Sequence, residues 1–166
     1  MSAVVRFDLD VVPDGARSSG VVAKPVSVGG RRAVQVRLSD DIELHGRPGV
    51  DYVDRSTFLV LPVSLARGTI SVDVHSRIRP GAPEMARGFA GLAFHIRSGR
   101  DAFESVYLRP LNGADENPPV ERRDRAVQYF AYPDHPFDRL RDERPGEYEA
   151  AARIGLDRWC PKRPAS

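Results

Sequence analysis

The chain has 166 residues and a formal net charge of only +2, because 25 basic residues nearly balance 23 acidic ones, so composition gives no reason to expect a nucleic-acid partner. The length suits one domain with a sizeable core, and 14 Gly with 14 Pro suit many short elements joined by turns. The single cysteine, Cys160, excludes an intrachain disulfide and a cysteine-based zinc cage.

The N-terminal segment is charged. Arg6, Asp8 and Asp10 interrupt the apolar core that a signal peptide needs, and no apolar run approaches the length of a membrane span. We therefore expect a cytoplasmic protein without a membrane partner, unless the gene start is misplaced or an export signal has been lost.

Hydrophobic spacing along the chain is typical of strands, and no stretch keeps a helical period over a dozen residues. Turn residues such as Gly29-Gly30 and Pro145-Gly146 separate the segments. The expected strands are 3–9, 33–38, 57–61, 69–78, 88–97, 103–111, 126–132 and 147–154. This pattern predicts an all-β antiparallel β-sandwich of the jelly-roll type, in a single domain over 1–159 with an irregular tail at 160–166.

Segment 69–78 alternates between apolar and polar residues. Ile70, Val72 and Val74 fall on one face and are expected in the core, with the polar residues between them in water.

Segments 89–97 and 103–111 predict an antiparallel hairpin, because Ser98-Gly99-Arg100-Asp101 between them has turn chemistry. We expect this hairpin to be central, with 126–132 antiparallel to it or nearby.

The faces of the hairpin follow from period-two geometry. Val106 and Leu108 point one way, which we take to be the core, while Tyr107 and Arg109 point the other way. With Gln128 they would give a surface carrying an aromatic ring, a cation and an amide, groups that stack on sugar rings and bind hydroxyls. A solvated or loop-covered sheet face is the alternative.

Several blocks of the sequence resemble one set of bacterial proteins. The chain from about 57 to 159 is similar to laminin-G-like jelly rolls of the concanavalin A-like lectin/glucanase superfamily, close to 3-keto-disaccharide hydrolase domains. The matching blocks are GFAGLAF at 88–94, FESVYLRPLNG at 103–113, AVQYFAYP at 126–133, PGEYE at 145–149, and Trp159.

The end of the chain departs from that family, in which the tryptophan opens a strand that leads into further strands. Here a basic, proline-containing segment, 160–166, follows Trp159 and cannot supply a central strand. We therefore expect an incomplete jelly roll with apolar sheet surface and free strand edges, through which it could self-associate. Relatives in such a family can be exported.

The matching blocks supply the candidate site residues. For substrate binding these are Tyr107, Arg109, Asn112 and Gln128. Glu104 and Glu149 are candidate catalytic carboxylates if their strands bring them to one face, although pairing with Arg109 or Arg125 is the more common role for carboxylates on sheets. No strand carries the paired carboxylates of ordinary retaining glucanases.

Metal chemistry has little support in the sequence. The four histidines share no metal-ligand spacing, so we expect no metal site and no cofactor. Asp8 with Asp10, or Asp51 with Asp54, could supply oxygen ligands to calcium, but no interleaved ligand loop accompanies them and turn roles are favoured. The charged segment 134–144 is expected to be a loop pinned by Phe137 and Leu140, of a length that often shapes a site.

Two functions remain. The first is a carbohydrate-binding or structural jelly-roll module without catalysis, with a carbohydrate ligand as its partner. The second is a glycoside-degrading enzyme of the 3-keto-disaccharide hydrolase type, whose activity the missing C-terminal strands could have abolished. Converging carboxylates in a cleft would favour the enzyme, and an aromatic and polar face would favour binding.

Overall fold

The computed structural model describes residues 4–160. Its contacts divide the chain into two compact units, Met1–Thr69 and Ile70–Ser166. Strands make up 31% of the structure and helices 14%, in keeping with the predicted all-β class. Each unit has its own small sheets, and the single domain over 1–159 stays a prediction.

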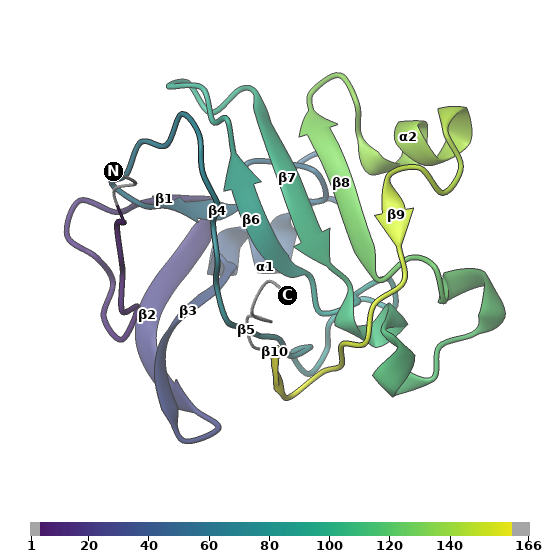
Figure 1. The fold of residues 1–166 in the computed structure, drawn as a ribbon, viewed down its shortest axis with the longest axis horizontal. Coiled ribbons are helices and arrows are strands. Elements are labelled where there is room, and N and C mark those ends of the chain that lie inside the picture. The colour runs from purple at the N-terminus through teal and green to yellow at the C-terminus, as the bar shows by residue number, and fades with distance from the viewer. Residues whose placement is uncertain (1–3, 161–166) are drawn as a thin grey trace. The chain divides into compact units, whose positions relative to one another are not determined.

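The first unit consists of two strand pairs and one short helix (Figure 1). Its elements are β1 (Arg17–Ser19), β2 (Val21–Val28), β3 (Arg31–Leu38), α1 (Asp40–His45) and β4 (Phe58–Val60). β1 pairs antiparallel with β4, and β2 pairs antiparallel with β3. Gly29 and Gly30 close the β2–β3 hairpin with φ angles of 57° and 73°, which a two-residue hairpin loop requires and glycine adopts without strain.

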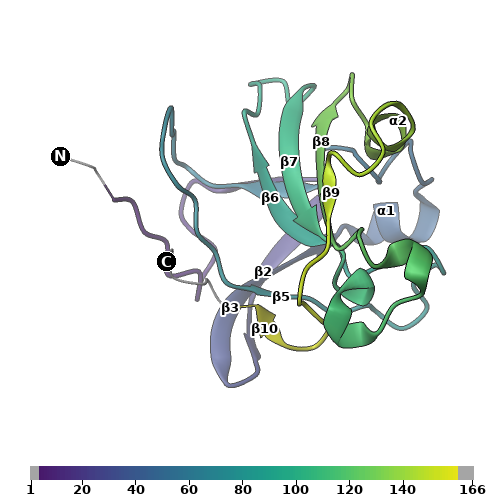
Figure 2. The same ribbon diagram turned by 45° about the vertical axis from the view of Figure 1, so that its right-hand side comes forward.

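The second unit contains a four-stranded antiparallel sheet in the order β6–β7–β8–β9, whose strands lie side by side in Figures 1 and 2. Its elements are β5 (Val74–His75), β6 (Ala90–Phe94), β7 (Phe103–Leu108), β8 (Val127–Tyr132), α2 (Phe137–Glu143), β9 (Glu149–Ala150) and β10 (Trp159–Cys160), with 3-10 turns at Pro110–Asn112, Ala114–Glu116 and Val120–Arg122. The predicted hairpin is confirmed as β6–β7, and β8 pairs antiparallel with β7 as expected.

Several predicted elements differ in the structure. Only Val74–His75 of the segment 69–78 forms a strand, and Ile70, expected in the core, is 49% exposed. Residues 4–9 form no strand, while 1–3 lie outside the described residues. Cys160, assigned to the irregular tail, belongs to β10, and the rest of that tail, 161–166, lies outside the described residues.

The sheet of the second unit has one covered and one more open face. The covered face, named here the Tyr107 face, buries Phe103, Ser105, Gln128 and Phe130. Phe130 meets Phe103 and Tyr107 edge to face, at ring-centroid distances of 5.6 and 5.7 Å.

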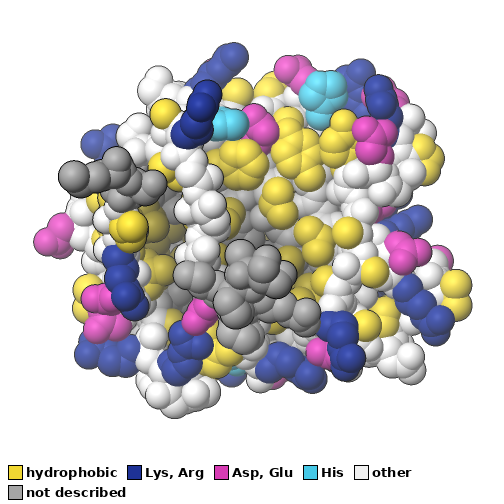
Figure 3. Space-filling view, in the orientation of Figure 1, with side chains coloured by type: hydrophobic (Ala, Val, Ile, Leu, Met, Phe, Trp, Pro, Cys, Tyr) yellow, Lys and Arg dark blue, Asp and Glu magenta, His cyan; other side chains and the backbone are white. Residues whose placement is uncertain are grey.

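The opposite face, named the Val106 face, carries Val106, which is 38% exposed. The prediction that turned Val106 into the core is therefore wrong. Both faces of the hairpin carry apolar residues. The face with the large aromatic rings of Phe103 and, on β8, Phe130 is the covered one, because these rings bury more apolar area than Val106 does. In Figure 3 hydrophobic side chains gather over β6, β7 and β8.

Candidate functional site

The predicted substrate-binding residues come together, but inside the protein. Tyr107 and Gln128 are directly opposite each other on β7 and β8, and the Arg109 guanidinium donates to the Tyr107 hydroxyl at 2.9 Å. This confirms that the three share one face. However, Arg109 is 5% exposed and Gln128 is fully buried, so the open sugar-binding surface predicted for them is wrong.

Asn112 is also buried, at 4% exposure. Its side-chain amide donates to the backbone oxygen of Arg125 at 3.1 Å, which ties the turn after β7 to the start of β8. We assign Asn112 a structural role.

The segment 134–144 explains why Arg109 is covered. It forms α2 rather than the expected loop, at the β9 edge of the sheet (Figure 2). Leu140 is buried, and Phe137 places its ring 5.2 Å from the guanidinium carbon of Arg109, which lies at the same distance from the ring of Tyr107. Arg109 is thus held between two aromatic rings, an arrangement that stabilises a cation removed from water.

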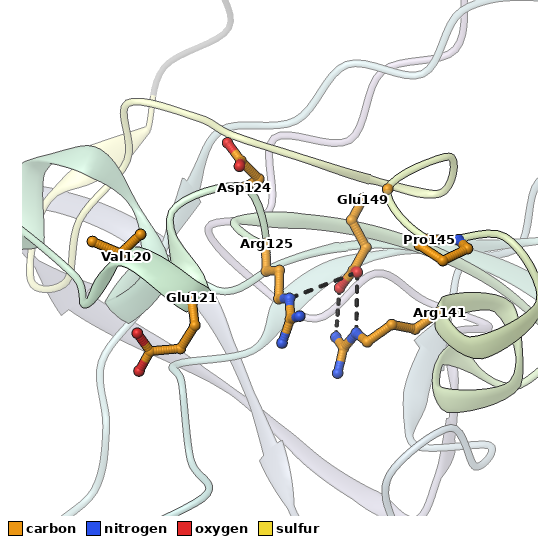
Figure 4. A pocket seen from close by; sticks show the side chains of 8 residues that line it. Val120, Glu121, Asp124, Arg125, Arg141, Pro145 and Glu149 are labelled. Atoms are coloured by element: carbon orange, nitrogen blue, oxygen red, sulfur yellow. Dashed lines mark hydrogen bonds and ion pairs between the residues drawn. The ribbon is translucent and has the colours of Figure 1, made fainter.

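Glu149 is the centre of a cluster of arginines (Figure 4). Its Oε1 accepts from Nη1 of Arg109 at 3.0 Å and from Nη2 of Arg141 at 2.5 Å, and its Oε2 accepts from Nε of Arg141 at 3.0 Å. Arg125 lies further off, with Nε 3.9 Å from Oε2. The Glu149 side chain is 5% exposed.

The charge state of Glu149 follows from these contacts. Burial raises the pKa of its carboxyl, but the hydrogen bonds from Arg141 and Arg109 outweigh burial and hold the pKa below its ordinary value. A carboxylate that stays ionised and has both oxygens occupied cannot deliver a proton to a substrate. Glu149 therefore has the arginine-pairing role that was the alternative to catalysis.

Glu104 lies on the opposite face, because it is in register with Ala131 on β8, one residue out of phase with the Ser105–Phe130 pair. Glu149 pairs with Gln128 and so belongs to the Tyr107 face. The two candidate catalytic carboxylates do not converge, and the hypothesis that they act together is wrong. Successive residues of a strand point to opposite faces, and Glu104 and Glu149 pair with β8 residues of opposite orientation, Ala131 and Gln128.

Glu104 forms a small polar network with two aromatic side chains. Its Oε1 is 2.6 Å from Nδ1 of His95, and its Oε2 accepts from the Tyr129 hydroxyl at 2.8 Å. The hydrogen bonds with His95 and Tyr129 lower the pKa of Glu104, while burial and the Glu104 charge raise the pKa of Tyr129 to about 12. Glu104 is thus a carboxylate that orients the His95 imidazole.

His95 stands at the end of β6 with a φ of 51°, in the left-handed region that β-carbon-bearing residues rarely adopt. Its side chain is 67% exposed. Because Nδ1 is turned to Glu104, the other ring nitrogen is the one available to a ligand.

A hollow of about 280 Å³ adjoins this network. It is lined by Tyr129, His135, Leu140 and Tyr148, and we name it the tyrosine hollow. Tyr129 and Tyr148 stack with ring centroids 5.6 Å apart and an angle of 30° between the rings. Tyr129 links the hollow to the network on the Val106 face, because it lines the hollow and also bonds to Glu104, which contacts His95.

Sequence reasoning missed this site, although a signal was present. Tyr129 has the same parity as Val127, and Tyr148 stands beside Glu149 in a matching block. Because the Val106 face was expected to be core, Tyr129 was not considered as a ligand-binding residue, and Tyr148 was noted only as the neighbour of Glu149.

In the comparisons with known proteins, no family model, curated protein or solved structure matches this chain. The resemblance to concanavalin A-like jelly rolls therefore stays a prediction. Across residues 4–160, the structure has no group of three or more His, Cys, Asp or Glu side chains that could hold a metal ion. No helix in the same range is long and apolar enough to cross a membrane.

Proposed function

We propose that this chain is a carbohydrate-binding module with a jelly-roll β-sandwich of the concanavalin A-like kind, and that it binds sugar at the tyrosine hollow. The observation that supports this most directly is the stacked pair of Tyr129 and Tyr148, which lines an open hollow on the sheet. Aromatic faces pack on the apolar faces of sugar rings, and the polar groups beside them bind hydroxyls.

The groups for hydroxyl recognition lie around the tyrosines. His135 lines the hollow, and the Glu104 carboxylate bonds to the hydroxyl of Tyr129. This combination of aromatic surface, carboxylate and imidazole differs from the ring, cation and amide expected around Tyr107, and it lies on the opposite face of the same sheet. Glu104 on β7, Tyr129 on β8 and Tyr148 all fall in matching blocks of the family resemblance.

A glycan array followed by calorimetric titration of the best ligand tests the proposal. Tyr148→Ala removes one ring of the pair and should weaken binding about tenfold, equivalent to about 1.4 kcal/mol, as expected for an aromatic contact at the centre of a site. Tyr52→Ala, in the first unit, is the matched control and should bind as the wild type does. The proposal is wrong if the wild type binds no glycan or if Tyr148→Ala binds equally well.

The second candidate function is a glycoside-degrading enzyme of the 3-keto-disaccharide hydrolase type. The contact of 2.6 Å between His95 and Glu104 favours it, because a carboxylate that fixes one imidazole nitrogen prepares the other to act as a general base. Turnover of oxidised disaccharides by the wild type, reduced about 100-fold or more in His95→Gln, would support the enzyme. Binding without turnover would support the module alone.

A further inference from the structure

The arginine cluster around Glu149 has more positive charge than Glu149 neutralises. Arg109, Arg125 and Arg141 all lie within 4.0 Å of its carboxylate, which supplies one negative charge against three positive ones. The Arg109 side chain is 6% exposed, but those of Arg125 and Arg141 are 40% and 26% exposed. The excess charge is therefore presented where a solute can reach it.

A hollow of about 300 Å³, named here the arginine hollow, opens onto this charge. Arg125, Arg141 and Glu149 line it together with Val120, Glu121, Asp124, Pro145 and Gly146 (Figure 4). Glu121 and Asp124 are exposed, and Figure 4 shows both carboxylates turned away from the guanidinium groups. Water and salt screen these exposed carboxylates as they also screen the partly exposed Arg125, so the orientation of the guanidinium donors, and not the net charge of the lining, favours an anion.

Hydrogen-bond donors remain available in the arginine hollow. Arg141 gives Nε and Nη2 to Glu149, and among residues 4–160 its Nη1 has no hydrogen-bond acceptor. Arg125 reaches Glu149 only through Nε, at 3.9 Å, and within the same range both of its Nη atoms lack an acceptor. In Figure 4 the free ends of the two groups point to the same side.

The cluster is also fixed before any ligand arrives. Glu149 holds Arg141 by a two-pronged contact, and the guanidinium carbon of Arg141 lies 5.1 Å from the ring centroid of Phe137. A guanidinium fork fixed in this way binds the oxygens of a carboxylate or phosphate with little loss of side-chain entropy.

We propose that the arginine hollow binds a small oxyanion, a phosphate or carboxylate group, between Arg125 and Arg141. The site is distinct from the tyrosine hollow: Glu149 and Tyr148 are successive residues, but Glu149 belongs to the Tyr107 face, whereas Tyr148 stacks on Tyr129 of the Val106 face. Anion binding at the arginine hollow does not require sugar binding at the tyrosine hollow.

Titrations with inorganic phosphate and with acetate, in low-salt buffer and followed by arginine side-chain NMR shifts, test the proposal on the full chain. Saturable binding of either anion with shifts at Arg125 and Arg141 is expected, and the anion that binds identifies the preferred group. Arg125→Gln should weaken binding about tenfold, the loss expected for one charge-assisted contact. Arg125→Lys keeps the positive charge but lacks the two-pronged guanidinium group, so its affinity for the anion should lie between those of the wild type and Arg125→Gln.

Arg97→Gln is the matched control, because Arg97 is exposed and lies in the β6–β7 hairpin loop; its affinity should equal that of the wild type. Melting curves of each variant verify folding, and a partly exposed Arg125 should tolerate substitution. The proposal is overturned if neither anion binds saturably, or if Arg125→Gln binds as tightly as Arg97→Gln does.

Discussion

Replacing Glu149 with glutamine should be among the most damaging single changes that this chain can suffer. Glu149→Gln keeps the shape of the side chain but removes the charge that three arginines share. Arg109 is then left between two rings with no anion beside it, at 6% exposure. An uncompensated buried charge is the cause of the expected loss.

The magnitude follows from how deeply each arginine is buried. Breaking a buried ion pair by removing one partner costs about 3–5 kcal/mol. Arg141 and Arg125 are 26% and 40% exposed and regain water, so the Arg109 contact dominates and the low end, about 3 kcal/mol, applies. For a chain of this size, each kcal/mol lowers the melting temperature by about 2–4 °C, which gives a fall of about 10 °C.

Thermal melts and urea titrations at several pH values measure this. Glu147→Gln is the matched control, since its partner Arg144 lies 3.3 Å away and both side chains are at least half exposed. Because the folded pKa of Glu149 is lowered, its contribution is present above the ordinary carboxyl pKa and is lost as the pH falls through the folded value. The free energy of unfolding of Glu149→Gln should therefore fall less steeply than that of the wild type as the pH is lowered. A melting temperature within about 2 °C of the control would refute the reasoning.

Two further outcomes are expected. In an alkaline absorbance titration, the part of the signal that disappears in Tyr129→Phe should have a midpoint near 12, because burial and the bond to Glu104 raise the pKa of Tyr129. Since the folded state holds that proton more tightly, the free energy of unfolding should fall between pH 10 and 12. A midpoint near 10 would contradict both the burial of Tyr129 and its bond to Glu104. Phe130→Ala should cost about 3–5 kcal/mol in denaturant unfolding because Phe130 is 4% exposed, whereas Val106→Ala, at a site 38% exposed, should cost about 1 kcal/mol; the reverse order would show that the covered face has been misassigned.

The β6–β7 hairpin was predictable because its information is local. Alternating residues flank a four-residue turn with glycine, and both signals survive without tertiary context. The orientation of its faces was not predictable in the same way. Val106 and Leu108 on one parity and Phe103 and Tyr107 on the other are all apolar or aromatic, so period-two geometry gives the grouping and leaves open which group is buried.

β1, β2, α1 and α2 were all missed, and the reasons differ between β2 and α2. β2 contains Lys24 and Pro25, and a proline argues against a strand because it has no backbone N–H to donate. In a two-stranded hairpin one edge of each strand is unpaired, and at that edge the missing N–H costs nothing. α2 was assigned as a loop, although Phe137 and Leu140 are spaced three apart and Pro136 precedes them, because seven residues are too few for a clear helical period.

The arginine cluster around Glu149 was the feature hardest to predict from the sequence. Arg109 and Glu149 are 40 residues apart and meet because β7 and β9 both pair with β8. The sequence offered this pair as one option among several. Only the register of three strands selects it, and register depends on contacts across the whole sheet.

β5 and β10 pair antiparallel, and this pairing bears on how the second unit folds during synthesis. Val74 is opposite Cys160, so a contact that belongs near the beginning of the unit needs a residue made 86 positions later. Closing so long a loop delays the contact, and chains rich in such distant contacts fold slowly. On the ribosome, the β6–β7–β8 part of the sheet can form while the chain is still growing, but the unit cannot close until Trp159 and Cys160 have left the exit tunnel.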